Sequence, residues 1–153
     1  MMLKIVTLQE ANGLLPLVKE HFLHIGMLLG SLHKIKFDIE QGHSTWKICP
    51  DSAFIKIIRK KNRRQIKEEL KKDVKKYENL VAEELSKIAK LGAVIKNLFP
   101  PHIDFLSTKN NELIYLCWHG SEPEITHWHY LDDGSPIRKV INKEQEFGPS
   151  VVH

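Results

Sequence analysis

The stretch Ile66–Gly92, IKEELKKDVKKYENLVAEELSKIAKLG, indicates most clearly which fold the chain adopts. Its apolar residues recur at intervals of three or four residues, which is the spacing of a long amphipathic helix with a seam close to a heptad. Gly92 is expected to end this helix, because glycine takes the left-handed conformation of a C-cap without strain. The helix is expected to start after a connector rich in helix breakers at residues 42–52.

The residues before this connector predict a second long helix. Thr7 and Glu10 have the spacing of a capping box, in which each side chain accepts a bond from an unpaired amide. Apolar residues then recur at helical spacing until about Gly42, and Pro16 is expected to cause a kink or a restart. Two long helices with one seam each and a short connector predict an antiparallel hairpin.

After Pro100 the hydrophobic period changes to two, which predicts strands separated by polar turns. The expected strands are Ile103–Ser107, Leu113–His119 and Ile125–Tyr130. They form a three-stranded antiparallel meander, and Leu3–Val6 is a candidate fourth strand. The predicted fold class is therefore α+β: a long antiparallel helical hairpin followed by a small meander of three to four strands.

Length and composition indicate a single globular domain. The chain has 153 residues, of which 42% are hydrophobic and 27% are charged. This is enough to bury one core without disulfides. Within a single domain of residues 1–153, we expect the short strand and the hairpin in residues 1–92. The meander is expected in residues 93–141, and a polar, loose tail in residues 142–153.

Cysteine usage and hydropathy bear on where the protein acts. The chain has two cysteines, Cys49 and Cys117, and neither lies in a CxxC pair, which favours a reducing environment. The apolar residues near the N-terminus are too interrupted for a signal peptide, and no run approaches the roughly 18 residues of a membrane span. We therefore expect a cytoplasmic protein with no membrane partner.

Alternation along the last two predicted strands gathers histidines on one face of the sheet. If His119 pairs with Ile125, Cys117 lies opposite His127, and His129 joins the same face. Three such ligands with an open fourth position are typical of a catalytic zinc site. The candidate zinc ligands are Cys117, His119, His127 and His129, and the candidate general bases are Glu122, Glu124 and Asp132. The alternative is a half-exposed sheet with surface histidines and a small buried thiol.

Several short motifs resemble those of a known family. They are Thr7-Leu8-Gln9-Glu10-Ala11-Asn12, Leu14-Leu15-Pro16, Leu91-Gly92, Ile103-Asp104-Phe105, Leu116-Cys117-Trp118, Glu122, Trp128-His129, Leu131-Asp132, Gly134 and Arg138. In this order they resemble the bacterial domain-of-unknown-function family 2203 over nearly the whole chain. The family has no assigned activity, so the resemblance implies candidate residues and no reaction. The family pattern favours Arg where His119 stands and Gly where Ile137 stands.

The resemblance directs attention to a second polar set. Its members are Glu122, His129, Asp132 and Arg138. Two carboxylates, one titratable imidazole and one guanidinium suit a pocket for an anionic group. The alternative is structural: Asp132 braces its turn, and Arg138 forms an ion pair with Glu122 or Asp132.

The net charge of +4 conceals two segments of opposite sign. Residues 56–76 contain 11 bases and three acids, whereas residues 103–137 contain one base and six acids. The candidate nucleic-acid contacts are Arg59, Arg63, Arg64 and Lys67. Arg59, Arg63 and Lys67 recur every four residues, so one face of the predicted helix is continuously positive, as contacts to phosphates require. The basic stretch lacks stacking aromatic residues and a known recognition motif, so the solvated face of a helix is favoured over a nucleic-acid site.

These observations support one leading hypothesis and two alternatives. The leading hypothesis is a non-enzymatic interaction module that self-associates as a homodimer through its long helices in coiled-coil fashion. The first alternative is a small hydrolase or ligand-binding domain with a polar site on the meander and zinc as its candidate cofactor. The second alternative is nucleic-acid binding through the basic helix. The pattern does not decide whether the protein is an enzyme.

Overall fold

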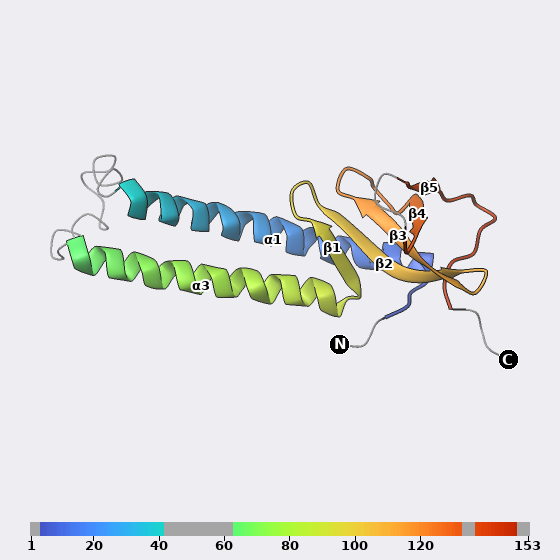
Figure 1. Ribbon diagram of the computed structural model, residues 1–153, viewed down its shortest axis with the longest axis horizontal. Helices are drawn as coiled ribbons and strands as arrows, with labels where there is room; N and C mark the ends of the chain where they lie inside the picture. The colour runs from blue at the N-terminus through green and yellow to red at the C-terminus, as the bar shows by residue number, and fades with distance from the viewer. Residues whose placement is uncertain (1–3, 42–62, 133–136, 150–153) are drawn as a thin grey trace. The chain divides into compact units, whose positions relative to one another are not determined.

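The computed structural model describes residues 4–41, 63–132 and 137–149, which form two helices followed by a five-stranded antiparallel sheet (Figure 1). The helices are α1 (Leu8–Gln41) and α3 (Arg63–Lys90). The strands are β1 (Ala93–Asn97), β2 (His102–Lys109), β3 (Glu112–His119), β4 (His127–Tyr130) and β5 (Lys139–Val140), adjacent in that order. The α+β class is confirmed, with more strands than the three or four predicted.

The chain divides into two compact units. Met1–Leu23 and Leu85–His153 form one, which we call the sheet unit, and His24–Glu84 forms the other, the helical unit. In the described residues, neither helix contains a stretch long and apolar enough to cross a membrane.

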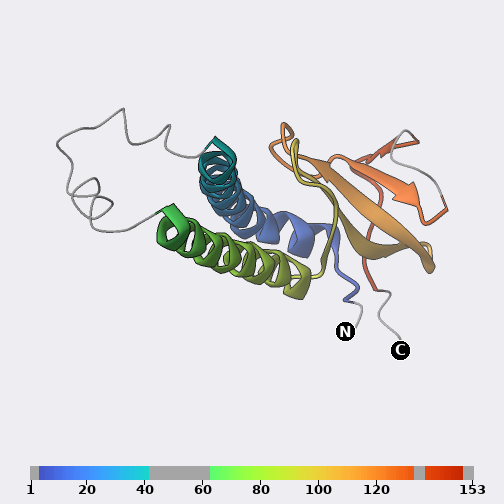
Figure 2. The ribbon, with the colours of Figure 1, turned by 60° about the vertical axis from the view of Figure 1, so that its left-hand side comes forward.

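In the helical unit, α1 and α3 lie side by side and run antiparallel (Figures 1 and 2). Their buried residues include Ile25, Leu28, Leu32 and Ile66. Polar contacts flank this seam: His24 Nδ1 lies 3.1 Å from Glu84 Oε1, and Lys36 Nζ forms an ion pair with Glu78 Oε1 over 3.6 Å. The predicted antiparallel hairpin is therefore confirmed, while the expected connector and helix start lie outside the described residues.

Helix α1 begins where the capping box predicts. The Glu10 amide donates to Thr7 Oγ1 over 3.0 Å, and the Thr7 amide donates to Glu10 Oε1 over 3.4 Å. The expected restart at Pro16 is wrong, because α1 continues through this residue. Leu15 and Val18 on either side are buried, and such packing offsets the one backbone bond that a proline removes.

Helix α3 ends at the glycine that was expected to cap it. Gly92 has a φ of 96°, and its amide donates to the Ala89 carbonyl over 3.0 Å. The chain then enters β1, a strand that alternation did not predict. Its pairing with β2 shifts between Ile95 and Asn97, and such a bulge breaks the period of two in a five-residue strand.

Leu3–Val6 does not form the expected fourth strand, because no strand is found at residues 4–7 and Leu3 lies outside the described residues. Two hydrogen bonds nevertheless hold this segment to the sheet. The Val6 amide donates to the Leu106 carbonyl over 3.0 Å, and Ser107 Oγ donates to the Val6 carbonyl over 2.6 Å. Both bonds are made by Val6 alone, and pairing at a single residue does not form a β-ladder.

The sheet register agrees with the predicted one at every tested position. Cys117 lies opposite His127, and Tyr115 lies opposite His129. One face of the sheet, the helix-side face, contains Phe105, Leu116, Trp118 and Trp128. The first half of α1 covers part of it: Lys19 Nζ lies 5.7 Å from the Trp118 ring centroid, and Asn12 Oδ1 accepts a bond from the Ile125 amide over 2.8 Å. The opposite face, the far face, contains His102, Asp104, Cys117, His119, His127 and His129.

The expected loose tail is wrong for residues 142–149. The Phe147 side chain is buried, with its ring centroid 6.1 Å from that of Trp128. The Gly148 amide donates to the Thr108 carbonyl over 3.0 Å. A polar composition suggested disorder, but one apolar anchor and the backbone bonds hold this segment against the sheet.

Candidate functional site

Asp104 lies at the centre of the far face. It stands in the middle of β2, directly opposite Cys117 of β3, and its side chain is 1% exposed. Its Oδ2 atom lies 3.1 Å from His129 Nε2 and 4.0 Å from Lys96 Nζ. Its Oδ1 atom is buried and has no hydrogen-bond partner within the described residues. A buried carboxylate is therefore only half satisfied.

His129 holds Asp104 in place. Its Nδ1 atom lies 2.8 Å from the Tyr130 carbonyl oxygen, which accepts and never donates, so Nδ1 must carry a proton. Its Nε2 atom faces the Asp104 carboxyl. One proton is therefore shared between Nε2 and Oδ2, and the His129 ring is fixed at both nitrogens.

Cys117 and His102 form a second contact of the cluster. Cys117 Sγ is buried and lies 3.2 Å from His102 Nε2. Burial, together with the charge of Asp104, raises the pKa of the Cys117 thiol to about 12. The thiol of the protein as it stands is therefore protonated near neutral pH, which makes it a poor nucleophile.

His119 packs its ring edge to face with that of His102, with 4.1 Å between the ring centroids. Burial lowers the pKa of both histidines, helped by the Arg138 charge at His119 and by His119 at His102. Both rings are therefore neutral at pH 7 and offer lone pairs. In the described part of the chain, His119 Nε2 is a further buried atom without a hydrogen-bond partner.

Glu122 and Arg138 close one side of the cluster. Glu122 Oε1 lies 2.7 Å from Arg138 Nη2, and the same nitrogen donates to the Cys117 carbonyl over 3.4 Å. Burial raises the pKa of Glu122, but the His119 amide and Arg138, which donate to it, hold that pKa below its usual value. This ion pair is the structural alternative foreseen for Arg138. Among the residues described, Arg138 Nε is buried without a partner.

The four residues of the predicted polar pocket separate in the structure. Glu122 and Arg138 are paired, and His129 binds Asp104. Asp132 is exposed beyond β4, where it lines a hollow of about 650 Å³ with Asn111, Glu112, Leu113, Tyr130 and Leu131. We find no hydrogen bond or ion pair between Asp132 and the other three in residues 4–41, 63–132 and 137–149.

The four predicted zinc ligands also divide. Cys117 and His119 lie with His102 in one group whose ligand atoms are all within 4.8 Å of one another, and Cys117 and His129 lie with Asp104 in another. His127 belongs to neither group. Its Nδ1 atom lies 2.8 Å from Thr126 Oγ1 and 3.8 Å from Glu122 Oε1.

Two of the four predicted nucleic-acid residues are fully described by the structure. Arg59 and the side chain of Arg63 lie outside it, whereas Arg64 and Lys67 are exposed on α3. Glu68 and Glu69 line a shallow hollow beside Arg64, so positive charge on this surface is interrupted by carboxylates.

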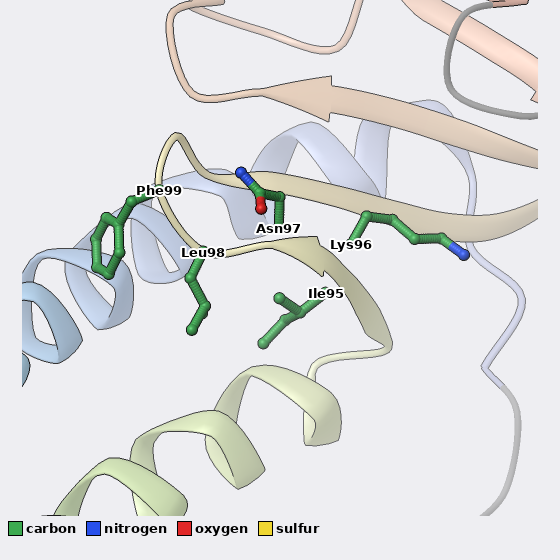
Figure 3. A pocket seen from close by; sticks show the side chains of 5 residues that line it. All are labelled: Ile95, Lys96, Asn97, Leu98 and Phe99. Atoms are coloured by element: carbon green, nitrogen blue, oxygen red, sulfur yellow. The ribbon is translucent and has the colours of Figure 1, made fainter.

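A hollow of about 460 Å³ at residues 95–99 differs in character from the far face (Figure 3). Ile95 and Leu98 point to one side of the chain and Asn97 to the other, where Asn97 Nδ2 donates to the Pro100 carbonyl over 2.8 Å. Lys96 leads away from the other four side chains. The hollow brings few polar groups together, so we place the candidate site on the far face.

The alternation of side chains along the last two predicted strands did not identify His102 and Asp104 as members of the cluster. A lone carboxylate inside the apolar run Ile103–Ser107 was the available signal, because a buried charge requires partners. Those partners are set by the register of β2 against β3. The sequence does not fix this register, because it leaves the length of the turn between the two strands undecided.

The model of a family described as "Uncharacterized conserved protein (DUF2203)" matches residues 4–141. The chain belongs to this family. No curated protein and no solved structure gives a significant match. We call the following residues the far-face cluster: His102, Asp104, Cys117, His119, Glu122, His129 and Arg138. Five of them also carried the family resemblance: Asp104, Cys117, Glu122, His129 and Arg138.

Proposed function

We propose that this chain is a ligand-binding domain whose site is the far-face cluster. Four buried side-chain polar atoms have no partner in the described residues, and three of them lie in this cluster. These three, Asp104 Oδ1, His119 Nε2 and Arg138 Nε, support the proposal, and we call them the unpaired atoms; the fourth, Trp128 Nε1, belongs to the helix-side face. Each such atom costs about 1–3 kcal/mol, and native proteins leave few of them. A bound ligand would satisfy atoms that the described part of the chain leaves unsatisfied.

The chemistry of the cluster suits binding better than nucleophilic catalysis. The Cys117 thiol is buried and its pKa is raised, whereas a catalytic cysteine needs an accessible thiolate. Two neutral histidines and a carboxylate instead present lone pairs to whatever enters. The ligand that fits these groups accepts electron pairs or donates hydrogen bonds, whereas Arg138 Nε, an N–H donor, needs an acceptor.

Thermal unfolding of the full chain, purified without a histidine tag, tests this proposal. Zinc chloride, sodium phosphate and guanidinium chloride at low millimolar concentration serve as separate probes for cations, anions and hydrogen-bond donors. At least one probe should raise the midpoint, because a ligand at 100 times its Kd stabilises by about 2.7 kcal/mol.

Two carboxylate variants provide the comparison. Asp104→Asn should abolish the shift, and Asp132→Asn, which changes an exposed carboxylate outside the cluster, should retain it. The absence of a shift with all three probes in the unmodified chain would contradict the proposal.

A second candidate function is self-association through the helical unit. Two helices cannot enclose their own seam: Leu70, Val74 and Tyr77 of α3 are only half-buried, and Met27 and Phe37 of α1 are 66% and 49% exposed. A second copy that packs helix against helix would cover these residues, as in a homodimeric coiled coil or four-helix bundle.

Sedimentation velocity at micromolar concentration tests self-association. The unmodified chain should sediment as a dimer, and the double variant Met27→Lys, Phe37→Lys should shift toward the monomer. Asn79→Lys, an exposed change on the face of α3 opposite Leu70, Val74 and Tyr77, is the control and should leave the dimer intact. A monomeric unmodified chain would rule out this second candidate.

We place either function in the cytoplasm. Cys117 is a free, buried thiol, and a chain with two cysteines outside any paired spacing suits a reducing compartment. Recovery of the protein from a soluble cytoplasmic fraction, with Cys117 reduced, is the expected result.

A further inference from the structure

We propose that the ligand of the far-face cluster is a divalent transition-metal ion of the zinc class, held by His102, Cys117 and His119, with Asp104 Oδ1 as the fourth ligand. This inference rests on the proposed function, because it names the ligand of the same site. All four residues come from two neighbouring strands, β2 and β3, so the backbone ladder fixes their spacing.

The ligand atoms of His102, Cys117 and His119 lie close enough together to share one ion, and the Asp104 carboxylate, which stands outside this group, would turn Oδ1 toward it. The three ligand atoms of His102, Cys117 and His119 all lie within 4.8 Å of one another. His102 Nε2 and Cys117 Sγ are 3.2 Å apart. A zinc ion about 2.0 Å from nitrogen and about 2.3 Å from sulfur separates the two ligand atoms by about 3.5 Å. Side-chain adjustments of a few tenths of an ångström are therefore sufficient at this pair.

One ion would also satisfy two of the three unpaired atoms. Asp104 Oδ1 lies 3.8 Å from His102 Nε2, compared with about 3.3 Å between a nitrogen and an oxygen that share a tetrahedral zinc ion. His119 Nε2 is buried and has no hydrogen-bond partner in the described residues, and we assign it as the ligand atom of His119. A cation among these atoms would give each a strong partner, which no described side chain supplies.

Charge balance supports a divalent ion in this buried place. The Cys117 thiolate and the Asp104 carboxylate would supply two negative charges to a doubly charged ion, and the proton that Asp104 shares with His129 leaves a net charge of +1 for the whole group. Burial penalises this remainder far less than it penalises an ion bound by neutral ligands alone. When the ion binds, the Cys117 thiol releases its proton to solvent. Sulfur and imidazole ligands favour zinc-like ions over Mg²⁺ and Ca²⁺, which prefer oxygen.

His129 is the positioning residue of this arrangement. It binds Asp104 through Oδ2 and is itself held by the Tyr130 carbonyl, so Oδ1 is left to face the ion. Outer residues of this kind orient the metal ligands. The competing arrangement uses the second group, Asp104, Cys117 and His129, in which His129 binds the ion and His119 does not.

Titration with Co²⁺ distinguishes these arrangements without any assay of activity. The full chain is purified without a histidine tag and treated with EDTA. Cobalt chloride should then give a thiolate-to-cobalt band in the near ultraviolet and strong tetrahedral bands in the visible region. Elemental analysis after incubation with zinc chloride should give one zinc ion per chain.

Four variants assign the ligands. Cys117→Ser should remove the near-ultraviolet band, and His119→Ala should weaken binding more than 100-fold. His129→Ala should weaken binding by about 10–100-fold and shift the visible bands, and His129→Gln, which still donates to Oδ2, should recover part of the loss. His127→Ala, on the same face but outside both groups, is the matched control and should bind normally.

Each contrary result has a distinct meaning. If neither Co²⁺ nor Zn²⁺ binds while phosphate or guanidinium still raises the unfolding midpoint, the metal is wrong and the ligand-binding function stands. If no probe has any effect, both proposals fail. If His129→Ala abolishes binding while His119→Ala binds normally, the assignment of ligands to His102, Cys117 and His119 is overturned. Circular dichroism of each variant confirms that it folds.

Discussion

Asp104 shows at the scale of one residue how the sheet combines stability with a candidate site. A carboxylate in the middle of a buried strand loses its hydration and needs compensation from its neighbours. His129 and Lys96 lie 3.1 Å and 4.0 Å from one of its oxygens, whereas the other faces the cluster. Stability therefore depends on one side of the carboxylate, and the proposed ligand binding on the other.

Removal of His129 should cost the protein much of its stability. His129→Leu leaves Asp104 without its closest partner, and breaking a buried pair in this way costs about 3–5 kcal/mol. His127→Leu, on the same strand but with a side chain that is 26% exposed, should cost at most about 1 kcal/mol. Urea unfolding of the metal-free proteins measures both values. Equal losses of unfolding free energy in the two variants would show that the His129–Asp104 pair does not contribute specifically to stability.

Glu122 should contribute stability that depends on pH. Its pKa in the folded protein lies below the ordinary value of 4.5, so the unfolded chain binds more protons between these two values. The contribution of Glu122 is therefore fully present above about pH 4.5 and is lost as the pH falls through the folded pKa.

Comparison with Glu122→Gln isolates this effect from that of other carboxylates. At pH 7 the variant should be less stable by about 1–3 kcal/mol, because it loses a charged hydrogen bond to Arg138. Denaturant unfolding at several pH values should show the difference shrinking below pH 4.5. A difference that stays constant down to the acid transition would contradict this account.

Elements with strong local signals were predictable from the sequence, and elements fixed by partners were not. The capping box at Thr7 and the glycine cap at Gly92 depend on neighbours in the sequence, and both are confirmed. The register of β3 against β4 followed from a five-residue turn. In contrast, β1 contains a bulge, and β5 has two residues, too few for any periodicity.

The candidate site was only partly predictable for the same reason. Cys117, His119 and His129 stand on strands with clear alternation, which placed them on one face. His102 and Asp104 join them through the pairing of β2 with β3, a contact that no local pattern encodes. Asp132 follows β4 closely in sequence, yet the chain turns away and leaves it exposed.

Two glycines should respond to alanine substitution in opposite directions. Gly92 has a φ of 96°, and an added Cβ would lie 3.3 Å from Lys4 Cβ. Gly92→Ala should therefore cost about 1–2 kcal/mol. Gly30 lies within α1, where an added Cβ would meet no heavy atom within 4 Å, so Gly30→Ala should stabilise by about 0.5–1 kcal/mol. Thermal and urea unfolding measure both, and changes of the same sign would contradict the helix boundaries described above.

At the scale of the whole molecule, the structure changes the meaning of the uneven charge. Residues 103–137 contain six acids, but Asp104 is buried and Glu122 is paired with Arg138. Fewer carboxylates are thus left to attract a basic partner than the sequence suggests. The charge asymmetry reflects in part the internal chemistry of the far face, where acids, histidines and one arginine meet.

A crystal structure of the full chain grown with zinc chloride tests the central claim most directly. The account predicts one ion on the far face, about 2.3 Å from Cys117 Sγ and about 2.0–2.1 Å from nitrogens of His102 and His119, with Asp104 Oδ1 as its fourth ligand. A far face without an ion, in which Asp104 Oδ1 and His119 Nε2 bind to other parts of the chain, would contradict it.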